Sequence, residues 1–94
     1  MAQTTVVNVP ALTWTQLTNG DVTTISFENL SEYDCYIAVT TDTTAPTDLT
    51  TAALYGPRRG EANLTLADVF DGTSGADRVW AYARDPIDVW VSHA

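Results

Sequence analysis

The chain has no lysine, and only four arginines offset its twelve aspartate and glutamate residues, so the formal net charge is −8. A surface this acidic repels phosphate, and nucleic-acid binding loses the electrostatic attraction on which it depends. An anionic membrane surface is disfavoured for the same reason. We therefore expect neither nucleic acid nor a membrane as a partner.

Cysteine and histidine occur once each among the 94 residues. One cysteine excludes an internal disulfide, and zinc sites built from His and Cys need three or four such ligands. Cys35 falls on the apolar face of a predicted strand, where a thiol packs as a small hydrophobic group. His93 is next to the last residue, a poor position for the oriented histidine of a catalytic triad. We expect no enzymatic activity, no metal and no cofactor.

No apolar run approaches the roughly 20 residues of a membrane-spanning helix. The first residues show neither the basic nor the apolar region of a signal peptide, so we expect synthesis in the cytoplasm without export. Asn29-Leu30-Ser31 and Asn63-Leu64-Thr65 match the glycosylation pattern. We interpret both as chance matches in a chain rich in Thr and Ser.

β-Branched residues are abundant: sixteen Thr, nine Val and three Ile make up 28 of the 94 residues. Such side chains fit a pleated sheet better than a helix. Asn19-Gly20-Asp21 separates two alternating runs and predicts a hairpin. Alternation predicts strands over residues 4–9, 12–18, 22–28, 33–40, 52–55, 61–66, 78–84 and 87–92, and one helical turn over residues 67–70.

This spacing of short strands predicts an all-β fold, a single-domain antiparallel β-sandwich or small β-barrel of seven or eight strands. The domain is expected to cover residues 1–94. Pro10 cannot donate to a strand ladder, so residues 1–10 are expected to form either an extended N-terminal arm or an edge strand.

Two tryptophans are candidate interface residues because they are out of phase with the small apolar residues around them. Trp80 alternates with Val79 and Ala81, and Trp90 alternates with Val89 and Val91. If the small residues face the core, the indoles lie on the outer face, where an apolar patch usually marks a contact. The alternative is that these rings fill a two-sided core.

Charged residues offer weaker candidates. Arg58-Arg59 is the only adjacent basic pair, and it is interpreted either as a solvated turn or as a docking point for acidic groups of a partner. Two acidic loops could in principle bind a cation, but neither has the spacing of a known calcium loop, and we expect solvated turn acids. The loops contain Asp42 and Asp48, and Asp68, Asp71 and Asp77.

Four segments carry a family resemblance: Tyr36-Ile37-Ala38-Val39-Thr40, Thr44-Ala45-Pro46-Thr47, residues 56–66, and the ending formed by Arg78-Val79-Trp80-Ala81-Tyr82-Ala83 and Val89-Trp90-Val91-Ser92-His93-Ala94. They resemble small Thr- and Ala-rich structural proteins of tailed-phage virions, over about residues 22–94. The resemblance implies an auxiliary capsid protein, of the decoration or cement type, that binds the outside of the phage head and stabilises it.

The same resemblance implies that the major capsid protein is the partner, and that the protein is located on the head surface of the virion. The outward tryptophans favour a homo-oligomer, and the resemblance implies either a trimer, the preferred form, or single copies on capsid hexamers. The alternative function is a head-fibre or tail-tip module that binds a host-surface glycan, through its aromatic side chains, or another virion protein.

Overall fold

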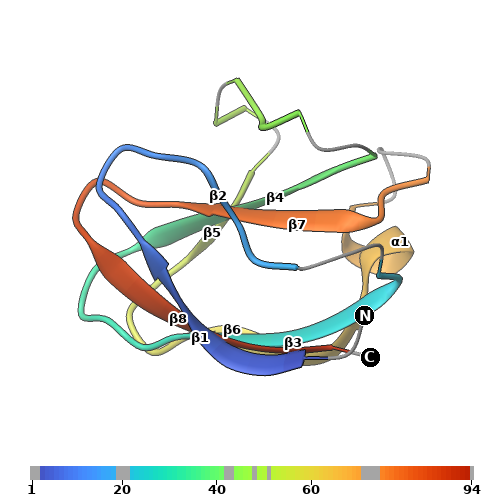
Figure 1. Ribbon diagram of the computed structural model, residues 1–94, viewed down its shortest axis with the longest axis horizontal. Helices are drawn as coiled ribbons and strands as arrows, with labels where there is room; N and C mark the ends of the chain where they lie inside the picture. Colours follow the sequence, from blue (N-terminus) through green and yellow to red (C-terminus); the bar gives the residue numbers. More distant parts are fainter. Residues whose placement is uncertain are drawn as a thin grey trace.

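The computed structural model describes residues 3–18, 22–41, 44–47, 49–50, 52–70 and 75–93. Within these residues, eight strands form two four-stranded antiparallel sheets stacked as layers (Figure 1). We call the sheet with the strand order β1-β8-β3-β6 sheet A, and the sheet with the order β2-β7-β4-β5 sheet B. The strands are β1 Gln3–Val9, β2 Thr15–Gln16, β3 Thr24–Asn29, β4 Cys35–Thr40, β5 Ala53–Tyr55, β6 Gly60–Thr65, β7 Arg78–Tyr82 and β8 Ile87–His93. The predicted all-β sandwich is thus confirmed.

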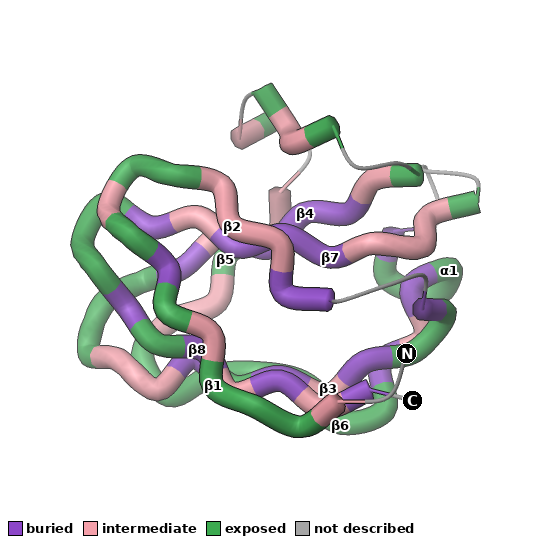
Figure 2. The backbone as a smooth tube through the Cα atoms, in the orientation of Figure 1, coloured by how far each residue is buried: buried purple, intermediate pink, exposed green. Residues whose placement is uncertain are grey.

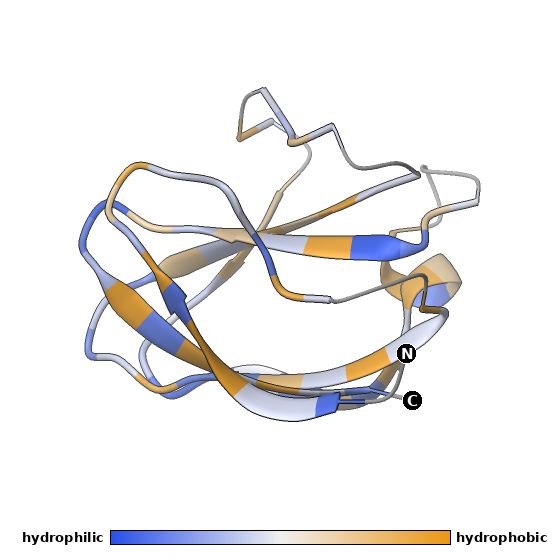
Figure 3. Ribbon diagram, viewed as in Figure 1, coloured by the Kyte–Doolittle hydropathy of each residue, from blue (hydrophilic) through white to orange (hydrophobic). Residues whose placement is uncertain are grey.

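The core lies between the two sheets because apolar residues alternate along the strands. Cys35 and Ile37 on β4 and Val89 and Val91 on β8 are all buried in it. Figures 2 and 3 show this alternation of buried, apolar positions with exposed or polar ones along the strands. The faces predicted for these strands are therefore confirmed.

The hairpin predicted at Asn19-Gly20-Asp21 is wrong. These three residues lie outside the described ones, but the strands on either side belong to different sheets: β2 pairs with β7, whereas β3 pairs with β6 and β8. Leu17, which directly follows β2 of sheet B, and Ile25 on β3 of sheet A are both buried in the one core. The burial of apolar side chains from both sheets therefore outweighs the local turn signal.

Residues 3–9 form an edge strand and not an extended arm, because all seven pair with β8. At the opposite edge of sheet A, β6 leads into a single helical turn, α1, over Leu66–Val69. No helix in the described part of the chain has the length and hydropathy to cross a membrane.

Candidate interaction surface

The outer face of sheet A presents Trp90 at its centre. The strand register places Val6 of β1, Trp90 of β8, Glu28 of β3 and Gly60 of β6 in one row across the sheet. Trp90 is half-buried, and Val6 is 51% exposed. The row therefore begins with apolar surface, continues with a carboxylate and ends at a position without a side chain.

A shallow groove of about 380 Å³ follows this row. Gly60 lines the groove at a position where no side chain fits, because a Cβ atom would overlap the carbonyl oxygen of Phe27. We call this the Trp90 groove, and its lining is Ser26, Phe27, Glu28, Arg58, Gly60, Glu61, Ala62 and Trp90. Two of the four residues predicted at an interface, Arg58 and Trp90, thus come together, although the sequence separates them by 32 positions (90 − 58).

Arg58 is presented to the groove by a tight turn. The amide of Arg59 donates to the carbonyl oxygen of Gly56 (3.1 Å), and Pro57 and Arg58 occupy the two central positions. Arg58 has φ +62°, a region in which residues other than Gly are disfavoured by about 1–2 kcal/mol. Its guanidinium is 3.4 Å from a carboxylate oxygen of Glu32, and both side chains are mostly exposed. Arg58 is therefore a charge held at the surface with a weak internal partner.

Arg59 has a different role from its neighbour. Its side chain is exposed and does not line the groove. Its carbonyl oxygen accepts a hydrogen bond from the amide of Asn29 (2.8 Å), which joins the turn to the end of β3. Of the predicted basic pair, Arg58 thus lines the groove, whereas Arg59 joins the turn to β3 through its main-chain carbonyl oxygen.

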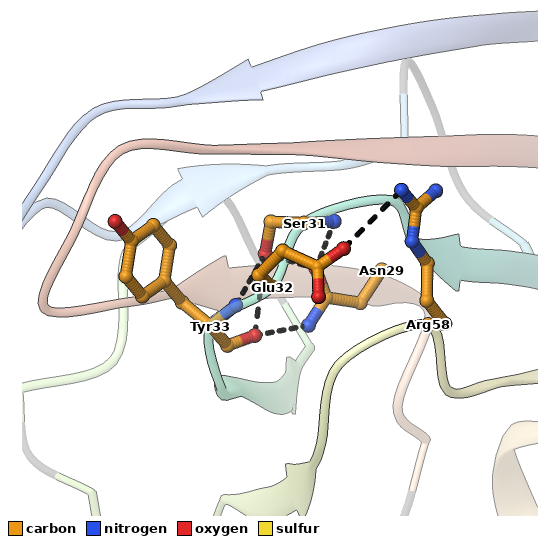
Figure 4. Close-up of polar contacts among 5 residues, drawn as sticks. All are labelled: Asn29, Ser31, Glu32, Tyr33 and Arg58. Carbon is orange, nitrogen blue, oxygen red and sulfur yellow. Dashed lines mark hydrogen bonds and ion pairs between the residues drawn. The ribbon is translucent and has the colours of Figure 1, made fainter.

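Asn29 is fully buried, and its side chain joins the loop of residues 30–34 to the turn of residues 56–59. Figure 4 shows its hydrogen bonds with Ser31 and Tyr33. Its side-chain amide donates to the carbonyl oxygens of Tyr33 (2.6 Å) and Gly56 (3.2 Å). Its Oδ1 accepts from the amide (3.0 Å) and the hydroxyl (2.7 Å) of Ser31. The apparent glycosylation pattern is therefore an Asx turn, and its amide is committed to hydrogen bonds.

The side chain of Glu61 forms a hydrogen bond between the two sheets, on the face of β6 opposite to that of Gly60. The Tyr55 hydroxyl of β5 donates to Oε2 of Glu61 on β6 (3.2 Å), and the Tyr55 ring packs edge-on against Phe27 (centroids 5.0 Å apart). Burial, together with the nearby Glu61 carboxylate, raises the pKa of Tyr55 to about 12. The phenol therefore remains a hydrogen-bond donor at neutral pH.

The exposure predicted for Trp80 is wrong, whereas its role at an interface stays a prediction. Its phase was correct, since Val79 and Ala81 belong to the core and Trp80 does not, but only 7% of it is exposed. The indole Nε1 donates to Oγ1 of Thr40 (2.8 Å), and the residue opposite it on β4 is the small Ala38. The chain that follows β4 passes on this side of sheet B (Figure 1). Trp80 is therefore buried on the face of sheet B that points away from the core.

A second surface, which sequence reasoning did not predict, lies on sheet B. Trp14, Tyr82 and Tyr36 are half-buried, with Tyr82 5.1 Å from Trp14 and 6.4 Å from Tyr36 between ring centroids. Beside Tyr36 is a pocket of about 300 Å³. We call it the Tyr33 pocket, and its lining is Glu32, Tyr33, Asp34, Tyr36, Arg84 and Asp85. The sequence signal for it was the phase of Tyr36 on β4 and of Tyr82 on β7, which alternate with core residues.

The remaining candidates do not gather into a site. Cys35 is fully buried, and burial with the charge of Asp34 raises its thiol pKa to about 12. His93 is buried at the end of β8, opposite Gln3. Asp77 is 3.0 Å from the guanidinium of Arg78.

The acidic loops are only partly visible. Asp42, Asp48 and Asp71 lie outside the described residues, and Asp68 is exposed. Among the residues that the structure describes, no three His, Cys, Asp or Glu side chains are grouped so that they could hold a metal ion.

Comparison of the chain with protein-family models, with curated proteins and with solved structures found no match.

Proposed function

We propose that the chain is a structural protein of a tailed-phage virion, a capsid decoration protein that binds the outside of the head and strengthens it. Its partner is the major capsid protein, and it acts by binding and not by catalysis. The observation that carries the proposal is the Trp90 groove, a shallow hollow of sheet A that Trp90 and Arg58 line together.

The composition of the groove suits a protein partner. Trp and Arg are enriched among the few residues that supply most of the binding energy at interfaces. Arg58 can bind a carboxylate through two parallel hydrogen bonds. Breaking its present pair with Glu32 costs little, because an ion pair with side chains 61% and 78% exposed contributes no more than about 1 kcal/mol. The groove thus offers both an apolar anchor and a charge free to change partner.

A small interface is sufficient for this function. A molecule that binds only the assembled state stabilises it by about 2.7 kcal/mol per site at a hundredfold excess over Kd. The gain is repeated at every equivalent position of a lattice. A 94-residue sandwich without a disulfide can therefore strengthen a head through many weak contacts.

Binding to heads that lack the protein tests the proposal through matched variants. Trp90→Ala should weaken binding about thirtyfold, the loss typical of an interface tryptophan. Arg58→Gly removes the charge at little cost to the fold, because glycine tolerates the positive φ of this position. The controls are Trp14→Ala and Arg84→Ser, which change the same residue types on the other surface. Equal losses for variants and controls would contradict the assignment of the groove.

The alternative, a head-fibre or tail-tip module that binds a host-surface glycan, is favoured by one observation: the rings of Trp14, Tyr82 and Tyr36 lead to the carboxylates and the guanidinium of the Tyr33 pocket. Aromatic rings pack against the C–H faces of sugars, and carboxylates accept hydrogen bonds from their hydroxyls. Under this alternative, Tyr33→Ala abolishes binding and a sugar quenches tryptophan fluorescence, whereas Trp90→Ala changes neither.

A further inference from the structure

The free edge of β1 is unlike the other sheet edges. β1 pairs with β8 along all seven residues, and no described strand pairs with its other side. Three consecutive residues, Thr4, Thr5 and Val6, are exposed. Alternate residues of an edge strand direct their N–H and C=O groups away from the sheet. The backbone of β1 therefore offers a regular row of hydrogen-bonding groups.

Features that normally block edge-to-edge pairing are present on the other edges. Strand β6 has a register irregularity opposite β3, a positive φ at Asn63 and a charged Glu61. Strands β2 and β5 have only two and three residues. Strand β1, by contrast, contains no charge and no proline in the sequence QTTVVNV. Proteins usually protect edges of this kind, so an unprotected one marks a pairing site.

We propose that β1 pairs with β1 of a second copy of this chain, antiparallel and around a two-fold axis at Val6. Val6 is the middle residue of Gln3–Val9, so this register pairs every residue of the strand. Thr4 then faces Asn8 of the second copy, and Thr5 faces Val7. The result is one continuous eight-stranded sheet made from two copies of sheet A. An isologous contact of this kind closes after two copies, in place of the trimer expected from the resemblance.

Charge favours this edge as the contact between two copies. Each copy carries −8, so most surfaces of one repel the same surfaces of the other. The edge of β1 brings together two uncharged segments. It also buries Val6, which is 51% exposed in the single chain, and continues the apolar row from Trp90 through Val6 into the second copy. The pair presents two Trp90 grooves on one face, which allows bivalent binding.

Disulfide trapping with Val6→Cys tests the register. Directly opposed residues of antiparallel strands have Cα atoms about 4.5–5.5 Å apart, within the range that a disulfide spans. Cys35 is fully buried and does not compete. Leu54→Cys is the control, because Leu54 is 57% exposed on the edge strand β5 of the other sheet. Under mild oxidation, Val6→Cys should form covalent dimers much faster than Leu54→Cys, and equal rates would overturn the proposal.

Introducing a charge at Val6, the residue on the proposed two-fold axis, gives an independent test by mass measurement. The wild type should have twice its chain mass of 10.2 kDa, and so should Leu54→Glu. Val6→Glu alone and Val6→Lys alone place like charges opposite each other and should raise the dimer Kd at least about tenfold. An equimolar mixture of the two variants should restore the dimer. A monomeric wild type at its highest soluble concentration, or a mixture that stays monomeric, would overturn the proposal, whether or not the protein binds phage heads.

Discussion

Replacing Asn29, a fully buried polar residue, with Ala should destabilise the fold severely. The substitution removes four hydrogen bonds within the described residues: two donated to the carbonyl oxygens of Tyr33 and Gly56, and two accepted from Ser31. Each such bond contributes about 0.5–1.5 kcal/mol net. Tyr33 is half-exposed, so water can replace part of the loss. We expect a decrease of about 3 kcal/mol in the free energy of unfolding.

Urea denaturation and thermal melting measure this effect. For a chain of this length, 3 kcal/mol corresponds to a fall in Tm of about 12–24 °C. The control is Gln16→Ala. It removes a side-chain amide that donates to the carbonyl oxygen of Thr18 (2.7 Å), only two residues away in the sequence, and it should cost about 1 kcal/mol or less. If Asn29→Ala and Gln16→Ala have the same effect, the loops beside the Trp90 groove are not held by Asn29, and the argument from its buried bonds is refuted.

Three further outcomes are expected. Gly60→Ala should destabilise the fold by about 2–4 kcal/mol in urea denaturation, because its Cβ would overlap the Phe27 carbonyl oxygen. The control is Gly56→Ala, which should cost less than about 1 kcal/mol because the nearest atoms to its Cβ would be 3.8 Å away. The pKa values of Cys35 and Tyr55 rise from 9.0 and 10.0 to about 12 on folding. The folded state therefore keeps protons that the unfolded state loses, and stability should fall as the pH rises from 9 to 12; a flat profile over that range would contradict both burials. A thiol reagent at pH 8 should label Cys35 only after unfolding, and rapid labelling of the native protein would contradict its burial.

Much of the fold could be predicted because period-two alternation carries the burial pattern directly. Cys35 and Ile37 alternate with Asp34, Tyr36 and Ala38, and their predicted core face is the observed one. The helical turn predicted over residues 67–70 is found over Leu66–Val69. The strand order could not be predicted, because alternation says which face is buried and nothing about which strands are neighbours.

The candidate site was predicted only in part, for a similar reason. Trp90 and Arg58 were predicted as interface residues on separate grounds. That both line one groove depends on the pairing of β3 with both β6 and β8. Trp80 had the same phase as Trp90 relative to its neighbours but is buried, because alternation indicates on which face of the sheet a residue lies and not how exposed it is there. Asn29 was read as part of a chance pattern, and its partners at Gly56 and Arg59 lie about 30 residues along the chain, beyond any local signal.

The central claim, that this protein strengthens a phage head, is tested most directly by the melting of heads stripped of it. The purified chain is added back, and bound copies and the temperature of head disruption are measured together. We predict saturation at a fixed number of copies per head and a melting temperature that rises with occupancy. Saturated binding without any rise in melting temperature, or binding to tails and not to heads, would contradict the claim.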